Sequence, residues 1–402
     1  MSVSGLRKTL QNTNFAKLWI GQIVSNLGDE VAFFGIAVLV VFSWGGSAVD
    51  VSIVMIASSL PVLLFGPIAG VFVDRWNKKI TMIAADMIRA ILALIFIFCT
   101  SVIQLAVVVF LISTASRFFY PARMSLIPEI MERDILVEAN SLSQVTYMSA
   151  VILGPVISTG MIYVLGYLWI FVFDSLTYIF SALMLLTIRY KRHYAKATEK
   201  NALNEMIEGF KYILKNPAVK AIIMAFVLMM LFVGGLNAAY SVYVRDVLHM
   251  NITGYGLMEV LFGIGTIVGS VSTGILAGKM KSGRMVFLGI FGIGLMIFLM
   301  GAFPIPIIAM TAGGFTIGFF VAFVDGPSSA ILQRAVEEKF RGRVFSAVGA
   351  LVQSAALVSL VMIGLLISLF GVLPVIFVSG CVVSIVGLYL LLSAKVNKIV
   401  DV

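Results

Sequence analysis

Two adjacent carboxylates, Asp29 and Glu30, interrupt the first long apolar segment of the chain, in the stretch SNLGDEVAFFG. An ionisable side chain inside a membrane span costs about 2.5–3.5 kcal/mol on insertion scales, so each is a candidate for function. A carboxylate that exchanges a proton near neutral pH would suit proton coupling, and it would also bind a cationic substrate. Neighbouring helix residues point about 100° apart, so we expect at most one of the two to face a central cavity squarely. The alternative is a structural hydrogen bond to another helix.

Other charges also lie within apolar segments. Asp86 and Arg89 are three residues apart, a spacing that pairs them along one helix face, and such a self-satisfied pair is the alternative to a cavity role. Asp174 and Glu259 fall in the outer halves of their segments and are candidates to line an outer cavity. Arg117 lies in the inner half of its segment.

The segments that carry these charges are long enough to cross a bilayer. The 402 residues are 61% hydrophobic and 12% charged, about half the charge typical of a soluble domain. A bilayer core of ~30 Å needs roughly 20 apolar residues, and a backbone in lipid must satisfy its own hydrogen bonds within a helix. We therefore predict an all-α membrane protein with twelve transmembrane helices, at about residues 17–43, 51–73, 79–99, 102–122, 142–164, 168–188, 218–240, 253–276, 285–303, 306–328, 344–369 and 373–394.

Basic residues gather on one side of the predicted membrane. With a cytoplasmic N-terminus, 25 of the 28 Lys and Arg residues fall on the cytoplasmic side, and only Arg245 falls in an outer loop. This bias follows the positive-inside rule. We therefore expect a multi-pass protein of the cell inner or plasma membrane with both termini in the cytoplasm. Topology and lipid contact explain the net charge of +9, and no nucleic-acid partner is predicted.

Motifs of enzymes and ATP-driven pumps are missing from the sequence. No Walker sequence, metal-binding cluster, serine nucleophile elbow or cofactor loop occurs. Cys99 and Cys381 lack the spacing of a disulfide framework or a metal site, and His193 and His249 fall in loops on opposite sides. We therefore expect that the protein is not an enzyme, that it binds no metal and no cofactor, and that a proton gradient is its energy source.

The chain divides into two similar halves. Pro121 matches Pro327 and Leu126 matches Leu332, at an offset of about 205 residues. Between the halves, apolar residues recur at spacings of three and four, which predicts an amphipathic helix on the inner leaflet or against the bundle. Parallel six-helix repeats are a transporter design in which substrate binds between the halves. The expected organisation is an N-terminal six-helix bundle, a cytoplasmic linker with the amphipathic helix, and a C-terminal six-helix bundle, at residues 1–188, 189–217 and 218–402.

The stretch GVFVDRWNKK, residues 70–79, resembles the cytoplasmic loop signature of the major facilitator superfamily. Asn77 stands where the family usually has Gly, and we expect this departure to be mild because Asn tolerates the left-handed conformation that a turn needs. The resemblance covers nearly the whole chain and includes a degenerate second copy at residues 274–284. It implies the major facilitator fold, with two pseudo-symmetric six-helix bundles. The signature is carried by Gly70, Asp74, Arg75, Lys78 and Lys79.

In this superfamily the signature loop latches the cytoplasmic side while the outer side is open. The resemblance implies that Asp74 meets the start of the eleventh span, RGRVFSA, which holds Arg341 and Arg343. Asp325, at the inner end of the tenth span, is expected to belong to this gate rather than to the cavity. The alternative is that the bases of the loop only set the topology.

Arg117 falls where the superfamily often keeps an arginine linked to proton transfer or to the latch. The partners that we expect for it are Asp29, Glu30 or Asp74.

The fifth predicted span contains GPVISTG, in which Gly154, Pro155 and Gly160 resemble the Gly-Pro motif of the superfamily's drug:proton antiporters. Two further stretches, SNLGDEVAFFGIAVLVVF and PARMSLIPEI, resemble the branch that contains macrolide-efflux and enterobactin-exporter proteins. These resemblances imply a monomeric, proton-coupled exporter of amphipathic small molecules, of the drug or macrolide type linked to antibiotic resistance, that works by alternating access. The alternatives are a siderophore or lysophospholipid transporter, or a non-transporting sensor on the same scaffold.

Overall fold

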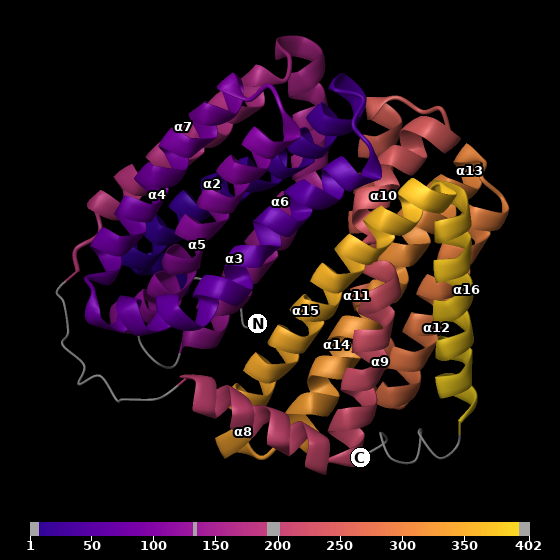
Figure 1. The fold of residues 1–402 in the computed structure, drawn as a ribbon. Helices are drawn as coiled ribbons and strands as arrows, with labels where there is room; N and C mark the ends of the chain where they lie inside the picture. The colour runs from indigo at the N-terminus through magenta and orange to yellow at the C-terminus, as the bar shows by residue number, and fades with distance from the viewer. Residues whose placement is uncertain (1–7, 132–134, 191–201, 394–402) are drawn as a thin grey trace. The chain divides into compact units, whose positions relative to one another are not determined.

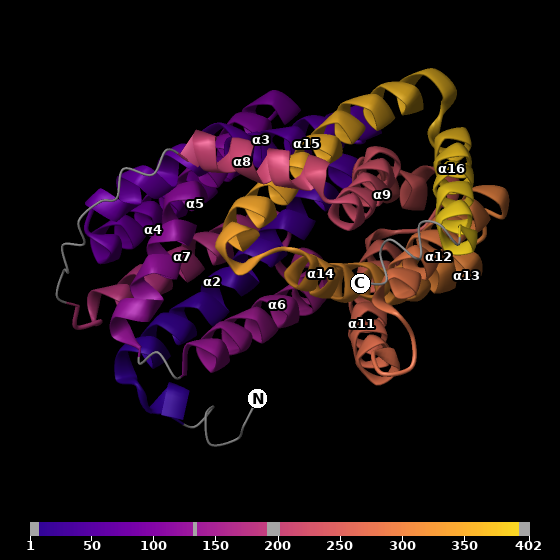
Figure 2. The same cartoon turned by 90° about the horizontal axis from the view of Figure 1, so that it is seen from below.

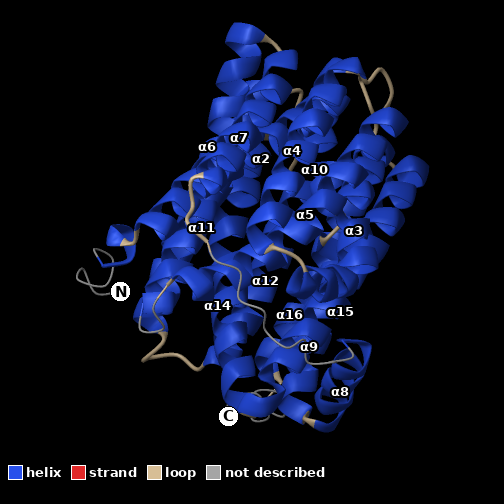
Figure 3. Cartoon of the chain, turned by 90° about the vertical axis from the view of Figure 1, so that its left-hand side faces the viewer, coloured by secondary structure: helices blue, strands red, loops and turns tan. Residues whose placement is uncertain are grey.

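The structure, a computed structural model, describes residues 8–131, 135–190 and 202–393, without the side chains of residues 67, 68, 70, 71, 74, 137, 202–206, 338 and 339. This part of the chain is helical and contains no strand (Figure 3). Twelve of its helices are long and apolar enough to cross a membrane. The prediction of an all-α protein with twelve spans is therefore confirmed.

Contacts divide the chain into two compact units. Unit 1 comprises Met1–Val40 and Ile53–Glu199, and unit 2 comprises Val41–Ser52 and Lys200–Val402. The helices of the first half are α2 (Thr13–Val38), α3 (Ala48–Arg75), α4 (Lys78–Ile95), α5 (Val102–Ile130), α6 (Leu136–Leu165) and α7 (Leu168–Leu186), with the short turns η1 (Leu39–Ser43) and η2 (Phe96–Phe98). Those of the second half are α8 (Ala202–Lys215), α9 (Pro217–Val233), α10 (Leu236–Val242), α11 (Ile252–Leu276), α12 (Ser282–Ala302), α13 (Pro306–Ile308), α14 (Ile317–Ala335), α15 (Glu338–Phe370) and α16 (Val372–Leu392), with the π-helical turns η4 (Tyr243–Val247) and η5 (Ala309–Thr316).

Four helix pairings recur in the two units. In unit 1, α2 packs against α6 and α7, while α4 packs against α5 and α7 (Figure 1). In unit 2, α9 packs against α15 and α16, while α12 packs against α14 and α16. The repeat that is visible in the sequence thus corresponds to a repeated packing arrangement inside each unit.

An asparagine caps the first helix of each repeat. The side chain of Asn12 accepts a hydrogen bond from the backbone N–H of Phe15 and donates one to the carbonyl of Ile130, at the end of α5. Asn216 caps α9 in the same way and donates to the carbonyl of Ala335, at the end of α14. An N-cap carboxamide satisfies helix N–H groups that have no partner within the helix. Here it also ties the start of one helix to the end of another.

The tight turns between the last two helices of each repeat are closed by glycine. Gly166 ends α6 with φ +90°, and Gly371 ends α15 with φ +83°. Residues with a side chain rarely adopt this conformation, because Cβ clashes with the backbone, whereas Gly adopts it at no steric cost. Each glycine therefore allows the chain to reverse directly into the next helix.

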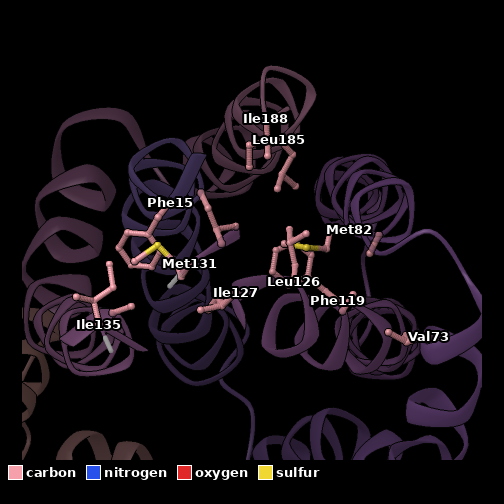
Figure 4. Close-up of a cluster of buried hydrophobic side chains, with 14 residues drawn as sticks. Phe15, Val73, Met82, Phe119, Leu126, Ile127, Met131, Ile135, Leu185 and Ile188 are labelled. Carbon is pink, nitrogen blue, oxygen red and sulfur yellow. The ribbon is translucent and has the colours of Figure 1, made fainter. Parts of the chain in front are cut away.

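An apolar cluster closes the end of unit 1 that holds Lys78 (Figure 4). Phe15, Leu126 and Leu185 are among its buried members, and they come from α2, α5 and α7. Leu332, the repeat equivalent of Leu126, lies in the corresponding cluster of unit 2. Burial of a leucine side chain stabilises the fold by about 1.5–3 kcal/mol, so this end of each unit is firmly packed.

The linker helix α8 packs against α15 and α9 (Figures 1 and 2). Its inward face buries Ile213, whereas Ile207 and Leu214 remain exposed. The sequence left two placements open for this helix, on the inner leaflet or against the bundle. The structure shows the contact with the bundle.

Candidate functional site

A cavity of about 920 Å³ opens within unit 1. It is lined by side chains from α2 to α7, and many of them are polar. Six of the lining residues carry a charge, namely Asp29, Glu30, Arg89, Arg117, Arg123 and Asp174. Charges inside membrane spans are costly and mark sites of function, so this cavity is the candidate functional site.

Helix α2 presents Asp29 to the cavity. The hydroxyl of Tyr178, on α7, donates a hydrogen bond to its carboxylate. Asp174 lies four residues before Tyr178, one helix turn away, and its buried Oδ1 atom has no hydrogen-bond partner among the described residues. Helices α2 and α7 thus bring two carboxyl groups and a phenol to one wall.

Asp86 and Arg89 form the ion pair that their spacing predicted, and both side chains are buried in α4. The guanidinium of Arg89 also stacks over the rings of Phe119 and Tyr178, at 4.6 and 4.3 Å from their centroids. Its charge acts on Asp29 as well. Arg89 lines the cavity, whereas Asp86 is buried and is not among the lining residues. The pair is therefore part of the site and not only a structural contact.

Glu30 also lines the cavity, so both neighbours contribute to its wall, and which of them faces it squarely stays a prediction. The cavity extends along α5, α6 and α7 and therefore covers a wider sector of α2 than the 100° between adjacent residues. The surroundings of the two carboxylates do differ. Glu30 lies within hydrogen-bonding reach of the Tyr147 hydroxyl on α6, whereas Asp29 faces α7.

The side chain of Asp74, one of the three partners expected for Arg117, lies outside the described residues, and Arg117 itself lines the cavity. Its Nε atom donates to the carbonyl of Ser113 in its own helix, at 3.4 Å. Neither Asp29 nor Glu30 forms an ion pair with it in the described part of the chain, and Arg89 is the cation that acts on Asp29. Helix packing explains why Arg89 rather than Arg117 acts on Asp29. Helix α7, which contacts Asp29 through Tyr178, packs against α4, and α5 packs against α4.

Sequence reasoning missed Arg123, which it assigned to a cytoplasmic loop. Helix α5 continues to Ile130, eight residues beyond the predicted end at residue 122, and it carries Arg123 along the cavity wall. The guanidinium donates to Gln22 at 3.0 Å and stacks over Tyr120 at 5.3 Å. A span predicted from hydropathy ends at the first charged residues. The prediction therefore underestimates the length of a helix that continues past its apolar residues.

Glu259 lies apart from this cavity. It belongs to α11 in unit 2, within hydrogen-bonding reach of Tyr255 one turn earlier. The ring of Tyr240 meets Tyr255 edge-on, with 6.1 Å between centroids. Of the two residues expected to line an outer cavity, Asp174 thus lines the cavity of unit 1, and Glu259 lies in a separate tyrosine cluster.

A family model described as the Major Facilitator Superfamily matches residues 18–310 and 222–400. The chain belongs to the major facilitator superfamily. Macrolide efflux protein A of Streptococcus pyogenes is 23% identical over 400 residues, which cover 96% of this chain and 97% of that protein. The multidrug efflux pump Tap of Mycolicibacterium fortuitum is 25% identical over 353 residues, which cover 81% and 84% of the two chains.

Solved structures of transporters share the fold. A bacterial homologue of the iron transporter ferroportin, in an inward-facing state, has a TM-score of 0.70 at 15% identity and covers 98% of this chain and 100% of its own. A POT family transporter in complex with a thioalcohol-conjugated peptide has a TM-score of 0.76 at 12% identity, with 96% of each chain covered. The protein is therefore a multi-pass membrane transporter, not an enzyme, and its resemblance to the macrolide-efflux branch is confirmed.

The backbone conformation of the superfamily's signature loop differs from our expectation at Asn77. Asn77 has φ −74° and ψ 108°, and its side chain accepts a hydrogen bond from the backbone N–H of Ile80 at 3.2 Å. The expected left-handed conformation is therefore wrong. Asn serves here because its carboxamide caps α4. The burial of Gly70 and the side chain of Asp74 lie outside what the structure describes, and Arg75 is exposed at the end of α3.

The two lysines of the signature make contacts within unit 1. Lys78 pairs with Glu129 at the end of α5, and the hydroxyl of Tyr190 donates to the same carboxylate at 2.6 Å. Lys79 donates to the carbonyls of Leu186 and Ile188, both at 2.8 Å. The lysines thus fasten the start of α4 to the ends of α5 and α7. Neither the latch nor a purely topological role predicted these contacts.

The residues expected opposite the signature loop have neighbours in unit 2. Arg341 donates to the carbonyl of Val336 at 3.3 Å, and Arg343 pairs with Glu208 of α8. Asp325 is exposed on α14. The pair of Arg343 and Glu208 holds the linker helix against α15, and the latch itself stays a prediction.

The Gly-Pro motif lies inside α6, where that helix crosses α2. A Cβ atom on Gly154 would lie 2.7 Å from Cβ of Glu30, so only glycine permits this close approach. Pro155 is the next residue of the helix. A Cβ atom on Gly160 would meet nothing within 4 Å, so this second glycine has no such constraint. The first glycine of the motif therefore positions Glu30 at the cavity wall.

Proposed function

We propose that this protein is a proton-coupled exporter of amphipathic small molecules that works by alternating access. The names of its relatives, macrolide efflux protein A and multidrug efflux pump Tap, support export and a small-molecule substrate. Alternating access in this superfamily is rocking of one six-helix half against the other around a site near the midplane.

The observation that carries proton coupling is the excess of carboxyl groups around Arg89. The charge of this one guanidinium acts on Asp29, Asp86 and Asp174. One positive charge cannot neutralise three carboxylates in a low-dielectric interior, where unpaired charge is costly. Binding of protons removes the excess, and Asp29 and Asp174 can receive them because both line the cavity.

The remaining lining suits an amphipathic substrate. Phe33, Ile36, Val109 and Ile112 contribute apolar surface beside the charged groups. Ligand sites combine a mostly apolar surface with a few polar groups that fix orientation. A substrate that occupies this cavity would contact the same side chains that bind protons, and this shared occupancy is the physical basis of coupling between the two.

The test is transport by purified protein in vesicles with an imposed pH gradient, using a macrolide and dodecyl phosphate as two probes of opposite charge. We expect Asp29→Asn and Asp174→Asn each to abolish gradient-driven transport while leaving the protein folded. Asp246→Asn is the matched control, because Asp246 lies outside the cavity in a surface pair with Arg245. Normal gradient-driven transport by both cavity variants would overturn the proposed coupling site.

Wild-type vesicles separate this proposal from a non-transporting sensor. A sensor on the same scaffold would bind ligand without any flux, whereas an exporter accumulates it against its gradient. If neither probe moves, a growth screen in cells without their main pumps is the next measurement, and resistance abolished by a protonophore is the expected result.

A further inference from the structure

We infer that Arg117 and Arg123 form a subsite for an anionic group, such as a phosphate, carboxylate or sulfonate, on the amphipathic substrate. This inference rests on the proposed function, because it names the chemical class of the molecule that the same cavity takes. It assigns the arginines of α5 to the headgroup of the substrate and leaves the carboxyl groups of α2 and α7 to protons.

The first observation is that both arginines lack an anionic partner. Each lines the cavity, and no carboxylate in the described ranges forms an ion pair with either of them. Arg117 makes a long bond to Ser113 in its own helix. Arg123 donates to the neutral side chain of Gln22, and its buried Nε atom has no hydrogen-bond partner among the described residues. An unpaired guanidinium in such surroundings favours the arrival of an anion.

The second observation is that the carboxyl groups and the two arginines of the cavity come from different helices. The carboxyl groups of Asp29, Asp86 and Asp174 gather around Arg89 on α2, α4 and α7. Glu30 faces Tyr147 on α6. The charged residues that α5 contributes to the lining are both basic, so an anion that enters is attracted to this helix and repelled from the carboxyl groups of α2 and α7. Guanidinium groups bind phosphate and carboxylate through parallel hydrogen bonds, which adds geometric specificity to the attraction.

The third observation is the arrangement of polar and apolar groups along α5. Arg117 and Arg123 are six residues apart, about 9 Å along the helix axis and about 120° around it, and both long side chains nevertheless line the same cavity. Val109 and Ile112 line the cavity further toward the start of the same helix. A molecule with its anionic end at the arginines would therefore lay its apolar part against these residues.

A merely topological role for Arg123 fits the structure less well. Basic residues that only set topology extend into water at the membrane surface. Arg123 instead lies back along the cavity wall, with Tyr120 stacked on its guanidinium at 5.3 Å. Stacking of this kind holds the charged plane in a fixed orientation and leaves its edge available to a ligand.

Direct binding tests the subsite without any need for transport. Dodecyl phosphate, dodecyltrimethylammonium and inorganic phosphate are titrated by calorimetry against the full chain in lipid nanodiscs. We expect dodecyl phosphate to bind, and Arg117→Gln and Arg123→Gln each to weaken it at least tenfold. Arg123→Lys keeps the positive charge but loses the planar guanidinium with its parallel donors, and it should weaken binding less than Arg123→Gln does. The control is Arg334→Gln, because Arg334 is exposed on α14 and outside the cavity.

Three outcomes would overturn the inference. The first is tighter binding of dodecyltrimethylammonium than of dodecyl phosphate. The second is an unchanged affinity for dodecyl phosphate in both glutamine variants. The third is equal affinity for inorganic phosphate and dodecyl phosphate, which would reject an amphipathic ligand. Thermal unfolding of each variant shows that it is folded. Arginine-dependent binding without gradient-driven transport would retain the subsite and reject the proposed exporter, so the two failures can be told apart.

Discussion

The hydroxyl of Tyr178 donates a hydrogen bond to the carboxylate of Asp29 and thereby joins α7 to α2 at the cavity wall. The same aromatic ring lies over the guanidinium of Arg89, with 4.3 Å between Cζ and the ring centroid. One side chain thus contacts both an acid and the base that acts on it. This relationship makes Tyr178 a positioning residue for the proposed proton site.

Replacement of Tyr178 by Phe separates these two contacts. The variant keeps the ring over Arg89 but loses the hydrogen bond to Asp29, at a cost of about 1 kcal/mol in stability. We expect a folded protein whose transport rate depends on pH differently from the wild type. The measurement is the pH profile of transport in vesicles. Tyr243→Phe is the control, because its hydroxyl donates to the carbonyl of Met300 away from the cavity. Identical profiles for wild type and Tyr178→Phe would contradict the assigned role.

The pair of Lys78 and Glu129 predicts a stability effect. Lys78→Met leaves a largely buried carboxylate without its cation, and we expect a loss of about 1–3 kcal/mol in the free energy of unfolding. Lys78→Met combined with Glu129→Gln removes the uncompensated charge and should recover most of the loss. Thermal unfolding in detergent measures both. Strict additivity of the two single changes would show that the contact contributes nothing.

Two glycines of α6 form a matched pair. Gly154→Ala forces its Cβ to within 2.7 Å of Glu30, and we expect overpacking to cost about 1–3 kcal/mol and to reduce transport. Gly160→Ala meets nothing within 4 Å and should be neutral or slightly stabilising. The comparison uses thermal unfolding and vesicle transport. Equal effects of the two substitutions would remove the link between the motif and the position of Glu30.

Cys99 offers a test of the membrane orientation. It lies between α4 and α5, on the side that we expect to be outside. In a Cys381→Ser background, a membrane-impermeant maleimide should therefore label Cys99 in intact cells. Burial raises the pKa of the Cys99 thiol, so less of it is thiolate at neutral pH and labelling should accelerate as the pH rises. Labelling only after the cells are opened would place the N-terminus outside.

Features set by the solvent or by the local chain could be predicted from the sequence. The twelve spans follow from the length of apolar runs, because lipid forces the backbone to bond internally. The pair of Asp86 and Arg89 follows from its spacing within one helix. Two expectations were wrong, one that relied on the end of an apolar run and one that relied on the usual glycine of the family signature. Arg123 lies on a helix that extends beyond its apolar segment, and Asn77 caps a helix instead of adopting a left-handed turn.

The sequence by itself determined that this protein is a set of membrane helices in two related halves, since hydropathy, charge bias and the repeat are properties of the chain. Only the tertiary structure decided which polar and charged groups of different helices meet. Tyr178 lies 149 residues from Asp29, and Glu129 lies 51 residues from Lys78. Such contacts depend on how each helix is rotated about its axis and which neighbour it packs against. Those choices are made by side-chain packing among several helices at once, and no single helix encodes them.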